Sequence, residues 1–309
     1  MVEGTILMTS RFVGPFLVGL AAFLWATDSV FRFPVVSSLD PTFIVLSEHV
    51  IVVLLMLPPM LLVKRKELLL PGAIDWLALA FIGIGGSAIA TVLFTAAFIF
   101  INPSVVILLQ KIQPVVVVTL AMVFLGERPK RSFWAWAMLA LAAAVVLSFP
   151  DLNFTFISQG INVRSRGFYY ALGAAGIWAA ATVAGRHVAV RHSAGVVTFW
   201  RFVFGLGALI ALMFLQGVSV PWNVVWQGPT LKALAYMALI PGLVAMVIYY
   251  AGLRRTPAST ATFMELLFPL GAVALNTFFL GMPLDRVQLV AGVVLLFAVT
   301  MITMQGGRK

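Results

Sequence analysis

Apolar runs of about 20 residues recur along the whole of this chain, separated by prolines, glycines and clusters of charge. A helix of that length crosses a hydrocarbon layer of about 30 Å. Only 10% of the residues are charged and the mean hydropathy is +1.09, which excludes an ordinary soluble domain. The sequence therefore predicts an all-α membrane protein held in a lipid bilayer.

The breaks between the runs divide the chain into ten predicted spans, five in residues 1–150 and five in residues 151–309. The amino-terminal tail and the stretch 150–166 are polar enough to be loops. We place the spans, to within a few residues, at 12–33, 42–63, 74–100, 103–126, 132–149, 167–187, 194–216, 231–253, 257–281 and 285–305.

Lysines and arginines are unequally shared between the two sets of loops. With the amino terminus inside, thirteen lie at cytoplasmic ends and five, including Arg32, at outer ends. Positive residues accumulate on the cytoplasmic side, so both termini are predicted to be cytoplasmic. The net charge of +10 then fits loops facing anionic lipid, and no nucleic-acid partner is expected. No cleavable leader pattern precedes the first run, so we expect an uncleaved first span.

An internal repeat relates the two halves. Trp25-Ala26 recurs as Trp178-Ala179 after 153 residues, and Pro114 recurs as Pro269 after 155 residues. Because each half has an odd number of spans, the second must enter the membrane from the opposite side. The pattern predicts two inverted five-helix repeats around a central cavity, working by alternating access. One chain holds both halves, so we expect a monomer.

Three short runs carry a family resemblance: Pro114 with Phe124-Leu125-Gly126-Glu127-Arg128, Pro269 with Phe279-Leu280-Gly281, and Trp200-Arg201-Phe202. In their order and spacing, the chain resembles the drug/metabolite transporter superfamily, in its ten-span EamA-type branch. Within it, the chain is most similar to bacterial inner-membrane exporters of aromatic and other neutral amino acids. Two positions depart from the family pattern: Met282 stands where a glutamate is usual, and Glu48-His49 where an arginine is usual.

Each half carries one acid and one base inside its spans: Glu48 and Lys111 in the first, Arg201 and Glu265 in the second. The helical rise puts the members of each pair at one depth, which permits Glu48–Lys111 and Arg201–Glu265 ion pairs. Two interpretations stay open. Either the pairs hold each half together, or a zwitterionic substrate meets them, its carboxylate on a base and its ammonium on an acid.

Other polar groups share these spans. Gln110 and Gln113 flank Lys111. A histidine such as His49 has an ordinary pKa near physiological pH, so a proton coupled through Glu48, His49 or Glu265 is a hypothesis. Asp28 lies nearer the outer end of its span and is expected at the interface. Pro114 and Pro269 interrupt backbone hydrogen bonds and are predicted as a hinge pair, with a fixed kink as the alternative.

Aromatic residues indicate the character of the substrate. We expect Trp25 and Trp178 to face the cavity, with Phe94 and Tyr249 adding rings. Such a cavity accepts flat or apolar solutes by stacking and burial, although tryptophans also form interfacial belts.

These observations predict a secondary transporter that exports small metabolites, with neutral and aromatic amino acids as the expected substrates. The alternative is a carrier for drugs, organic cations or nucleotide-sugar-like metabolites. The chain has no cysteine and three histidines, two of them among arginines at a helix end, so neither a metal site nor a cofactor nor an intramembrane enzyme is expected. A passive channel would show rings of like charge rather than balanced pairs.

Overall fold

The computed structural model describes residues 2–69, 72–116, 118–119, 131–155, 160–256, 261 and 264–306. Every regular element within these ranges is helical. Eight helices are long and apolar enough to cross a membrane. Two shorter apolar helices, Pro103–Val116 and Leu267–Leu280, lie where the fourth and ninth spans are predicted. The all-helical membrane fold with about ten helices is therefore confirmed.

The first half comprises α1 (Val2–Ala26), α2 (Asp28–Val36), α3 (Pro41–Leu62), η1 (Arg65–Glu67), α4 (Ala73–Phe81), η2 (Ile82–Ile89), α5 (Ala90–Ala97), α6 (Pro103–Leu109), η3 (Gln110–Ile112) and α8 (Arg131–Ser148). The second half comprises α10 (Val163–Ala189), α11 (Ala194–Gln216), α12 (Trp222–Val225), α13 (Gly228–Met237), η4 (Ala238–Val244), α14 (Ala245–Leu253), α16 (Leu267–Leu280) and α17 (Arg286–Gly306).

One predicted loop is wrong and one is shorter than predicted. The amino-terminal tail is helical from Val2, and the first proline in that helix is Pro15. The loop predicted at 150–166 is confirmed at 150–155 and 160–162 but ends early, since α10 begins at Val163. The Asn162 and Ser165 side chains bond each other's backbone N–H groups there and cap the helix start.

Sequence signals explain several other helix ends. Asp40 before Pro41 and Asn102 before Pro103 each accept a backbone N–H two residues on, at 2.7 and 2.8 Å. Gly217 and Gly281 end α11 and α16 with φ of +62°, a left-handed conformation that glycine adopts without strain. These signals make the helix boundaries readable from the sequence.

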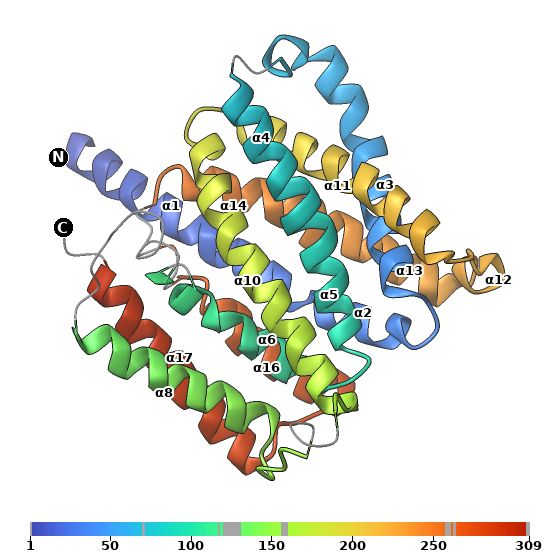
Figure 1. The fold of residues 1–309 in the computed structure, drawn as a ribbon. Helices are drawn as coiled ribbons and strands as arrows, with labels where there is room; N and C mark the ends of the chain where they lie inside the picture. Colours follow the sequence, from blue (N-terminus) through green and yellow to red (C-terminus); the bar gives the residue numbers. More distant parts are fainter. Residues whose placement is uncertain are drawn as a thin grey trace.

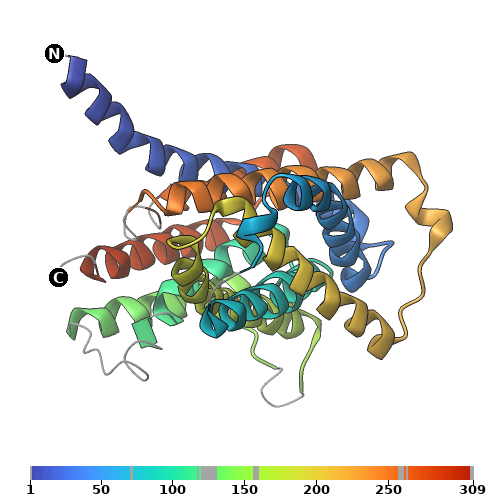
Figure 2. The same ribbon diagram turned by 90° about the horizontal axis from the view of Figure 1, so that it is seen from above.

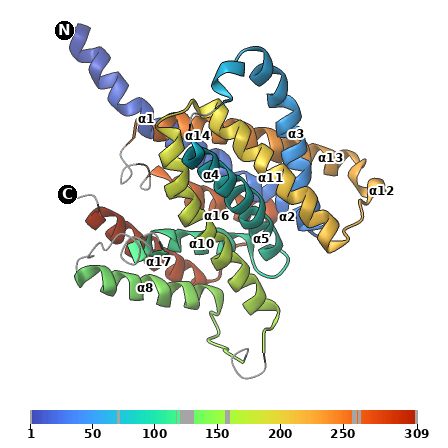
Figure 3. The same cartoon turned by 45° about the horizontal axis from the view of Figure 1, so that its top comes forward.

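The two halves interlock rather than sit apart. Helix α1 of the first half packs on α14 and α16 of the second, and α10 of the second packs on α4, η2 and α5 of the first (Figure 1). The last helix of each half, α8 and α17, lie side by side along one flank, as two views show (Figure 3). The start of α1 extends away from the bundle (Figure 2). Helix α1 begins and α17 ends on the same side of the bundle.

Breaks in the helices occur at equivalent places in the two halves. The third helix of each half contains a π-helical segment, η2 and η4. The fourth breaks into the 3₁₀ turn η3 before Pro114, and its counterpart turns at Glu265 and Leu266 before Pro269. Such interruptions are frequent at functional sites. All four breaks lie beside one central cavity.

Candidate functional site

A cavity of about 210 Å³ lies between the halves. Among the residues that line it, Arg32, Glu48 and Phe94 are buried, whereas Thr182 is exposed and Lys111 is half-buried. We call the side beside Arg32 the closed end and the side beside Thr182 the open end. The cavity brings together all the predicted pathway residues: Trp25, Glu48, His49, Phe94, Gln110, Lys111, Gln113, Trp178, Arg201, Tyr249 and Glu265.

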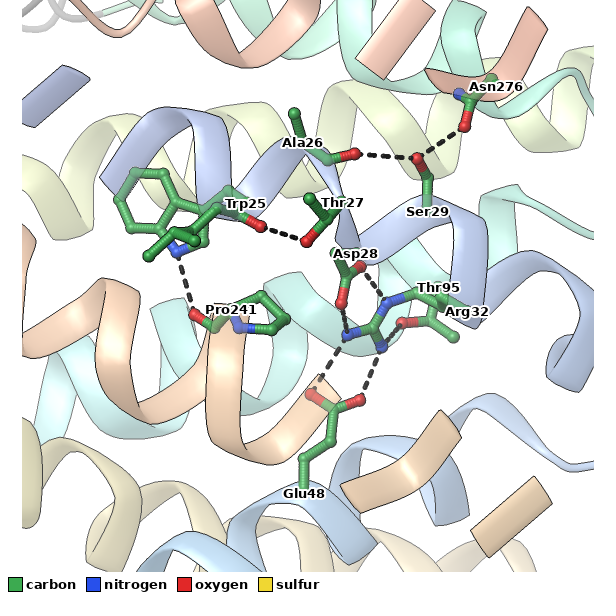
Figure 4. A network of polar contacts seen from close by, with 11 residues as sticks. Trp25, Ala26, Thr27, Asp28, Ser29, Arg32, Glu48, Thr95, Pro241 and Asn276 are labelled. Carbon is green, nitrogen blue, oxygen red and sulfur yellow. Dashed lines mark hydrogen bonds and ion pairs between the residues drawn. The ribbon is translucent and has the colours of Figure 1, made fainter. Parts of the chain in front are cut away.

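At the closed end, Arg32 is held between two carboxylates (Figure 4). Its Nη2 lies 2.8 Å from Asp28 Oδ1 and 3.1 Å from Glu48 Oε2, and its Nη1 donates to Thr95 Oγ1 at 2.9 Å. Nη1 also lies 2.8 Å from Glu48 Oε1, as an ion pair rather than an aligned hydrogen bond. Asp28 and Arg32 are four residues apart on α2, so they share one helix face.

This cluster corrects three expectations. The Glu48–Lys111 pair that the equal depths permit does not form, because Arg32 binds the Glu48 carboxylate. Asp28, expected at the interface, is buried, and Arg32, assigned to an outer end, is only 3% exposed. The signal that locates this pair is an acid and a base four residues apart inside an apolar run, where a buried charge must be paired.

Arg201, in contrast, is bound by neutral groups. Its three nitrogens donate to Ser87 Oγ at 3.3 Å, Tyr250 Oη at 3.2 Å and the Gly86 carbonyl at 3.4 Å. Within the described part of the chain, no ion pair joins it to Glu265 or to another acid, so the Arg201–Glu265 pair that the equal depths permit does not form. Helix α11 packs against η2 and directs Arg201 there.

His49 belongs to the same polar chain. Its Nδ1 lies 2.8 Å from the Val45 carbonyl and its Nε2 2.9 Å from Ser87 Oγ. A carbonyl only accepts, so we assign the hydrogen to Nδ1, and in the neutral ring Nε2 accepts from the Ser87 hydroxyl. Ser87 Oγ then accepts from Arg201, which links His49 to the cation through one hydroxyl group.

Lys111 and Glu265 meet across the two halves. Pro269 has no N–H, so the Glu265 carbonyl cannot make its usual helical bond and instead accepts from Phe268 N at 3.1 Å and Lys111 Nζ at 3.3 Å. The Lys111 ammonium also lies 5.4 Å from the Phe268 ring centroid, within cation–π range. The Glu265 carboxylate accepts from Tyr249 Oη at 3.0 Å.

The two cavity tryptophans make matching contacts with opposite halves. Trp25 Nε1 donates to the Pro241 carbonyl at 3.0 Å, and Trp178 Nε1 donates to the Gly86 carbonyl at 2.7 Å. Both acceptors belong to the π-helical segments η4 and η2. Figure 4 shows the first of these bonds.

Ring contacts repeat the same relation. Trp25 lies 4.9 Å from Tyr249 and Trp178 lies 5.4 Å from Phe94, centroid to centroid. In each pair one ring comes from each half. The ring pairs therefore form walls of the cavity that both halves build together.

A second polar cluster lies at the start of α4, around Asp75. Asp75 is buried and accepts from His192 at 2.8 Å, Arg191 at 2.9 Å and His187 at 3.1 Å, which ties α4 to the end of α10. Within the described ranges, no group of three or more His, Cys, Asp and Glu side chains is arranged to hold a metal ion.

The loop beside this cluster adds one more tie between the halves. Ser193 Oγ donates to Glu67 at 2.7 Å, and Lys64 binds the same carboxylate. The hydrogen bond from Lys64, and after it the one from Ser193, hold the pKa of the Glu67 carboxyl below its usual value.

Comparison with known proteins identifies the family. The model of the EamA-like transporter family matches residues 12–149 and again residues 165–304, one match for each half. The run from Phe124 to Arg128 falls outside the described residues, so its structure stays untested.

Individual relatives agree with this match. The riboflavin transporter ImpX of Fusobacterium nucleatum is 28% identical over 307 residues, which cover 96% of this chain and 99% of that protein. The uncharacterized transporter YwfM of Bacillus subtilis is 29% identical over 168 residues, covering 54% of this chain and 53% of YwfM.

A solved crystal structure superposes with a TM-score of 0.63 at 19% identity, covering 97% of this chain and 99% of that one, which shows a shared fold. The duplicated family match agrees with the repeat seen in the helix breaks and in the tryptophan contacts. The chain therefore belongs to the EamA-like transporter family of the drug/metabolite transporter superfamily, and it is a multi-pass membrane transporter of a small molecule, not an enzyme.

Proposed function

We propose that this transporter is a secondary carrier for a flat, uncharged heteroaromatic metabolite of the flavin type, with riboflavin as the first substrate to test. The observation that carries the proposal is the cavity wall made of the Trp25–Tyr249 and Phe94–Trp178 ring pairs. Aromatic walls bind flat solutes by stacking and by burial of apolar area. The relative ImpX, which aligns along almost all of the chain, is named a riboflavin transporter.

The charges of the cavity favour a substrate without net charge. Three cations line it, Arg32, Lys111 and Arg201, and three acids balance them, Asp28, Glu48 and Glu265. A phosphorylated solute would need converging cations in excess of acids. We therefore expect riboflavin to be preferred over flavin mononucleotide, by tenfold or more in kcat/KM.

The size of the cavity suggests how the substrate lies. Its volume of about 210 Å³ is smaller than the roughly 300–1,000 Å³ of sites that enclose drug-sized ligands. In our proposal the ring system occupies the closed end and a polar chain such as ribityl extends toward Thr182 at the open end.

Transport is proposed to proceed by alternating access between two five-helix halves of inverted orientation, in a monomer of a bacterial inner membrane. The interlocked packing of the halves and the paired helix breaks support this reading. Net export and proton coupling through Glu48, His49 or Glu265 remain predictions. Efflux from preloaded vesicles, with and without an imposed pH gradient, measures both.

The deciding experiment is uptake by proteoliposomes of riboflavin, flavin mononucleotide, tryptophan, phenylalanine and leucine. Saturable riboflavin uptake that accelerates when the vesicles are preloaded with unlabelled riboflavin supports the proposal, because trans-stimulation indicates a carrier. Empty liposomes are the control. Absence of flavin uptake by a folded, reconstituted protein would refute it.

Aromatic amino acids are the second candidate, favoured by one observation. Lys111 and Glu265 place a base and an acid close together beside the Phe268 ring. A zwitterion with an aromatic side chain could bind both charges and the ring. Uptake of tryptophan or phenylalanine in excess of riboflavin in the same panel would favour this candidate.

A further inference from the structure

Gln110 lines the cavity and carries a buried amide nitrogen that has no hydrogen-bond partner among the described residues. The residue is only 4% exposed, and Nε2 is the unpaired atom. Buried polar atoms are almost always paired, because an unpaired one loses its hydration without compensation. An orphan amide on a residue that lines a cavity points to a group that a ligand satisfies.

The backbone holds Gln110 in this position. Helix α6 ends at Leu109, and the Gln113 N–H bonds the Gln110 carbonyl to form the 3₁₀ turn η3. Pro114 lacks the N–H that would otherwise bind that carbonyl. The turn is therefore built into the chain, and the amide is preorganised before any ligand arrives.

The chemistry of the amide restricts what it binds. A carboxamide offers an acceptor oxygen beside a donor NH₂, and the two ends exchange by a flip of the group. A carboxylate ligand uses only the donor, and an ammonium uses only the acceptor. An amide or imide edge of a planar heterocycle, with N–H beside C=O, uses both at once.

We propose that Gln110 reads the amide or imide edge of a planar heterocyclic substrate held between the aromatic walls. In a flavin this edge is the pyrimidinedione N3–H with its flanking carbonyls. The inference rests on the proposed flavin-type function and adds the part of the molecule that is recognised. It makes Gln110 a specificity-determining residue.

The test compares riboflavin with N3-methylriboflavin, which lacks the N–H but keeps the ring system. Reconstituted wild-type protein is expected to prefer riboflavin about tenfold in kcat/KM, the effect of one or two lost hydrogen bonds. Gln110→Met should bring that preference to within about twofold. The matched variant Gln227→Met, at an exposed glutamine that does not line the cavity, should keep the tenfold preference.

The outcomes separate this inference from the function it rests on. If wild-type protein carries both flavins equally, or if Gln110→Met keeps the tenfold preference, the role of Gln110 is overturned while flavin transport stands. If no flavin is carried, both proposals fail. If Gln110→Met does not fold, Gln110→Asn, which withdraws the amide by one methylene group, takes its place and should likewise bring the preference to within about twofold.

A second inference stands on the tryptophan contacts, which are related by the repeat. Trp178 follows Trp25 by 153 residues, and the partners Pro241 and Tyr249 each follow Gly86 and Phe94 by 155. Each tryptophan thus donates to a carbonyl and touches a ring on the third helix of the opposite half. We call these two contact sets the tryptophan joints.

The inverted arrangement proposed above gives the joints a distinct role. In such a carrier, the state open to the opposite side arises when the two halves exchange conformations. After that exchange, the Trp25 joint has the geometry that the Trp178 joint has here, and the Trp178 joint has the geometry of the Trp25 joint. Since both are formed here, both are formed in the exchanged state as well.

We infer that the tryptophan joints are the pivot about which the halves rock, and that Trp25 and Trp178 are positioning residues. The Arg32 cluster has no such counterpart: the positions equivalent to Asp28, Arg32 and Glu48 are Ala181, Gly185 and Arg201. An ionic cluster that occurs in one half only can form in one state and break in the other. A contact that occurs in both halves is expected in both states.

Trp25→Phe and Trp178→Phe test the pivot, because each keeps a ring and removes the N–H. Each is expected to lower the melting temperature by a few degrees, to a similar extent. Each variant is also combined with Thr182→Cys, at the open end. The rate at which that cysteine reacts with an impermeant maleimide should change by no more than about twofold. Trp134→Phe, at an outward-facing ring that is 49% exposed, is the control for both readouts.

A joint that breaks in one state would give a different result. Loss of its N–H bond would then shift the balance of states, and labelling of residue 182 would change fivefold or more in one variant alone. That outcome overturns the pivot. If the phenylalanine variants do not fold, benzothienylalanine at position 25 or 178 keeps the shape of the indole and removes only the donor.

Discussion

The two arginines on the cavity differ in what surrounds them, although both come from apolar helices. Arg32 shares its guanidinium between Asp28 and Glu48, so that cluster has a formal charge of −1. Arg201 keeps a formal charge of +1 among neutral donors and acceptors. Charges so buried cost several kcal/mol unless they are paired, so Arg32 is suited to holding helices together and Arg201 to meeting a solute.

Removal of Arg32 should destabilise the protein far more than neutralisation of Glu48. Arg32→Met leaves two buried carboxylates without a counter-ion, at a cost of about 3–5 kcal/mol. Glu48→Gln leaves an intact Asp28–Arg32 pair, so the protein should fold with a melting temperature within a few degrees of wild type. Fluorescence-detected size-exclusion chromatography after heating measures both.

The control for this comparison is the exposed pair Arg164–Asp151, whose charged atoms lie 2.6 Å apart. Such a surface pair contributes about 0–1 kcal/mol, so Arg164→Met should melt like wild type. Equal stability of Arg32→Met and Arg164→Met would contradict the structural role of the Arg32 cluster.

Close packing of α11 on η2 and α3 is what brings Arg201 and His49 together. An added Cβ at Gly205 would lie 2.7 Å from His49 Nε2, and one at Gly83 would lie 2.8 Å from the Arg201 carbonyl. Only glycine permits this approach. The small residues in these helices therefore position the polar chain of the cavity rather than merely reduce bulk.

Gly205→Ala should displace the His49 ring from Ser87 and cost about 1–3 kcal/mol through overpacking. Gly207→Ala, two residues along the same helix, meets nothing within 4 Å and should be neutral or slightly stabilising. Melting temperatures of the two variants measure the difference. If both behave alike, the close approach at Gly205 does not constrain the fold.

Pro269 also leaves the Glu265 carbonyl free to accept a hydrogen bond from Lys111. Pro269→Ala restores an N–H that competes with Lys111 Nζ for the Glu265 carbonyl. We expect a higher melting temperature and a turnover reduced severalfold, with KM changed less than twofold, as the predicted hinge role requires. Pro283→Ala, in the loop after α16, is the control. Unchanged turnover would favour a fixed kink.

Helices of each half pack between helices of the other half, and together they enclose the cavity. Neither half therefore forms the site alone. In our proposal this requires the halves to cross the membrane in opposite directions. The two ends of the bundle then differ from each other in charge. Lys64, Arg65 and Lys66 lie at the cytoplasmic end, and Lys232 lies at the outer end.

Single-cysteine labelling tests that topology directly, because the chain has no cysteine of its own. An impermeant maleimide added to intact cells should label Lys232→Cys and leave Arg65→Cys unlabelled until the membrane is opened. Cytoplasmic tags at both termini should likewise be protected from external protease. Labelling of Arg65→Cys in intact cells would reverse the orientation, and a tag cleaved at one terminus alone would remove the basis for inverted halves.

The sequence by itself determined the helical membrane class, the approximate limits of most spans, the repeat and many of the side chains that meet in the cavity, although not Asp28 and Arg32. It could do so because hydropathy, proline and glycine act locally, and because burial of polar residues in lipid requires a shared polar interior. Only the tertiary structure decided the partners. Glu48 lies at equal depth with Lys111 yet binds Arg32, since depth along a helix does not specify which neighbour its face meets. The reciprocal bonds of Trp25 and Trp178 likewise depend on how the two halves interlock, which no local pattern encodes.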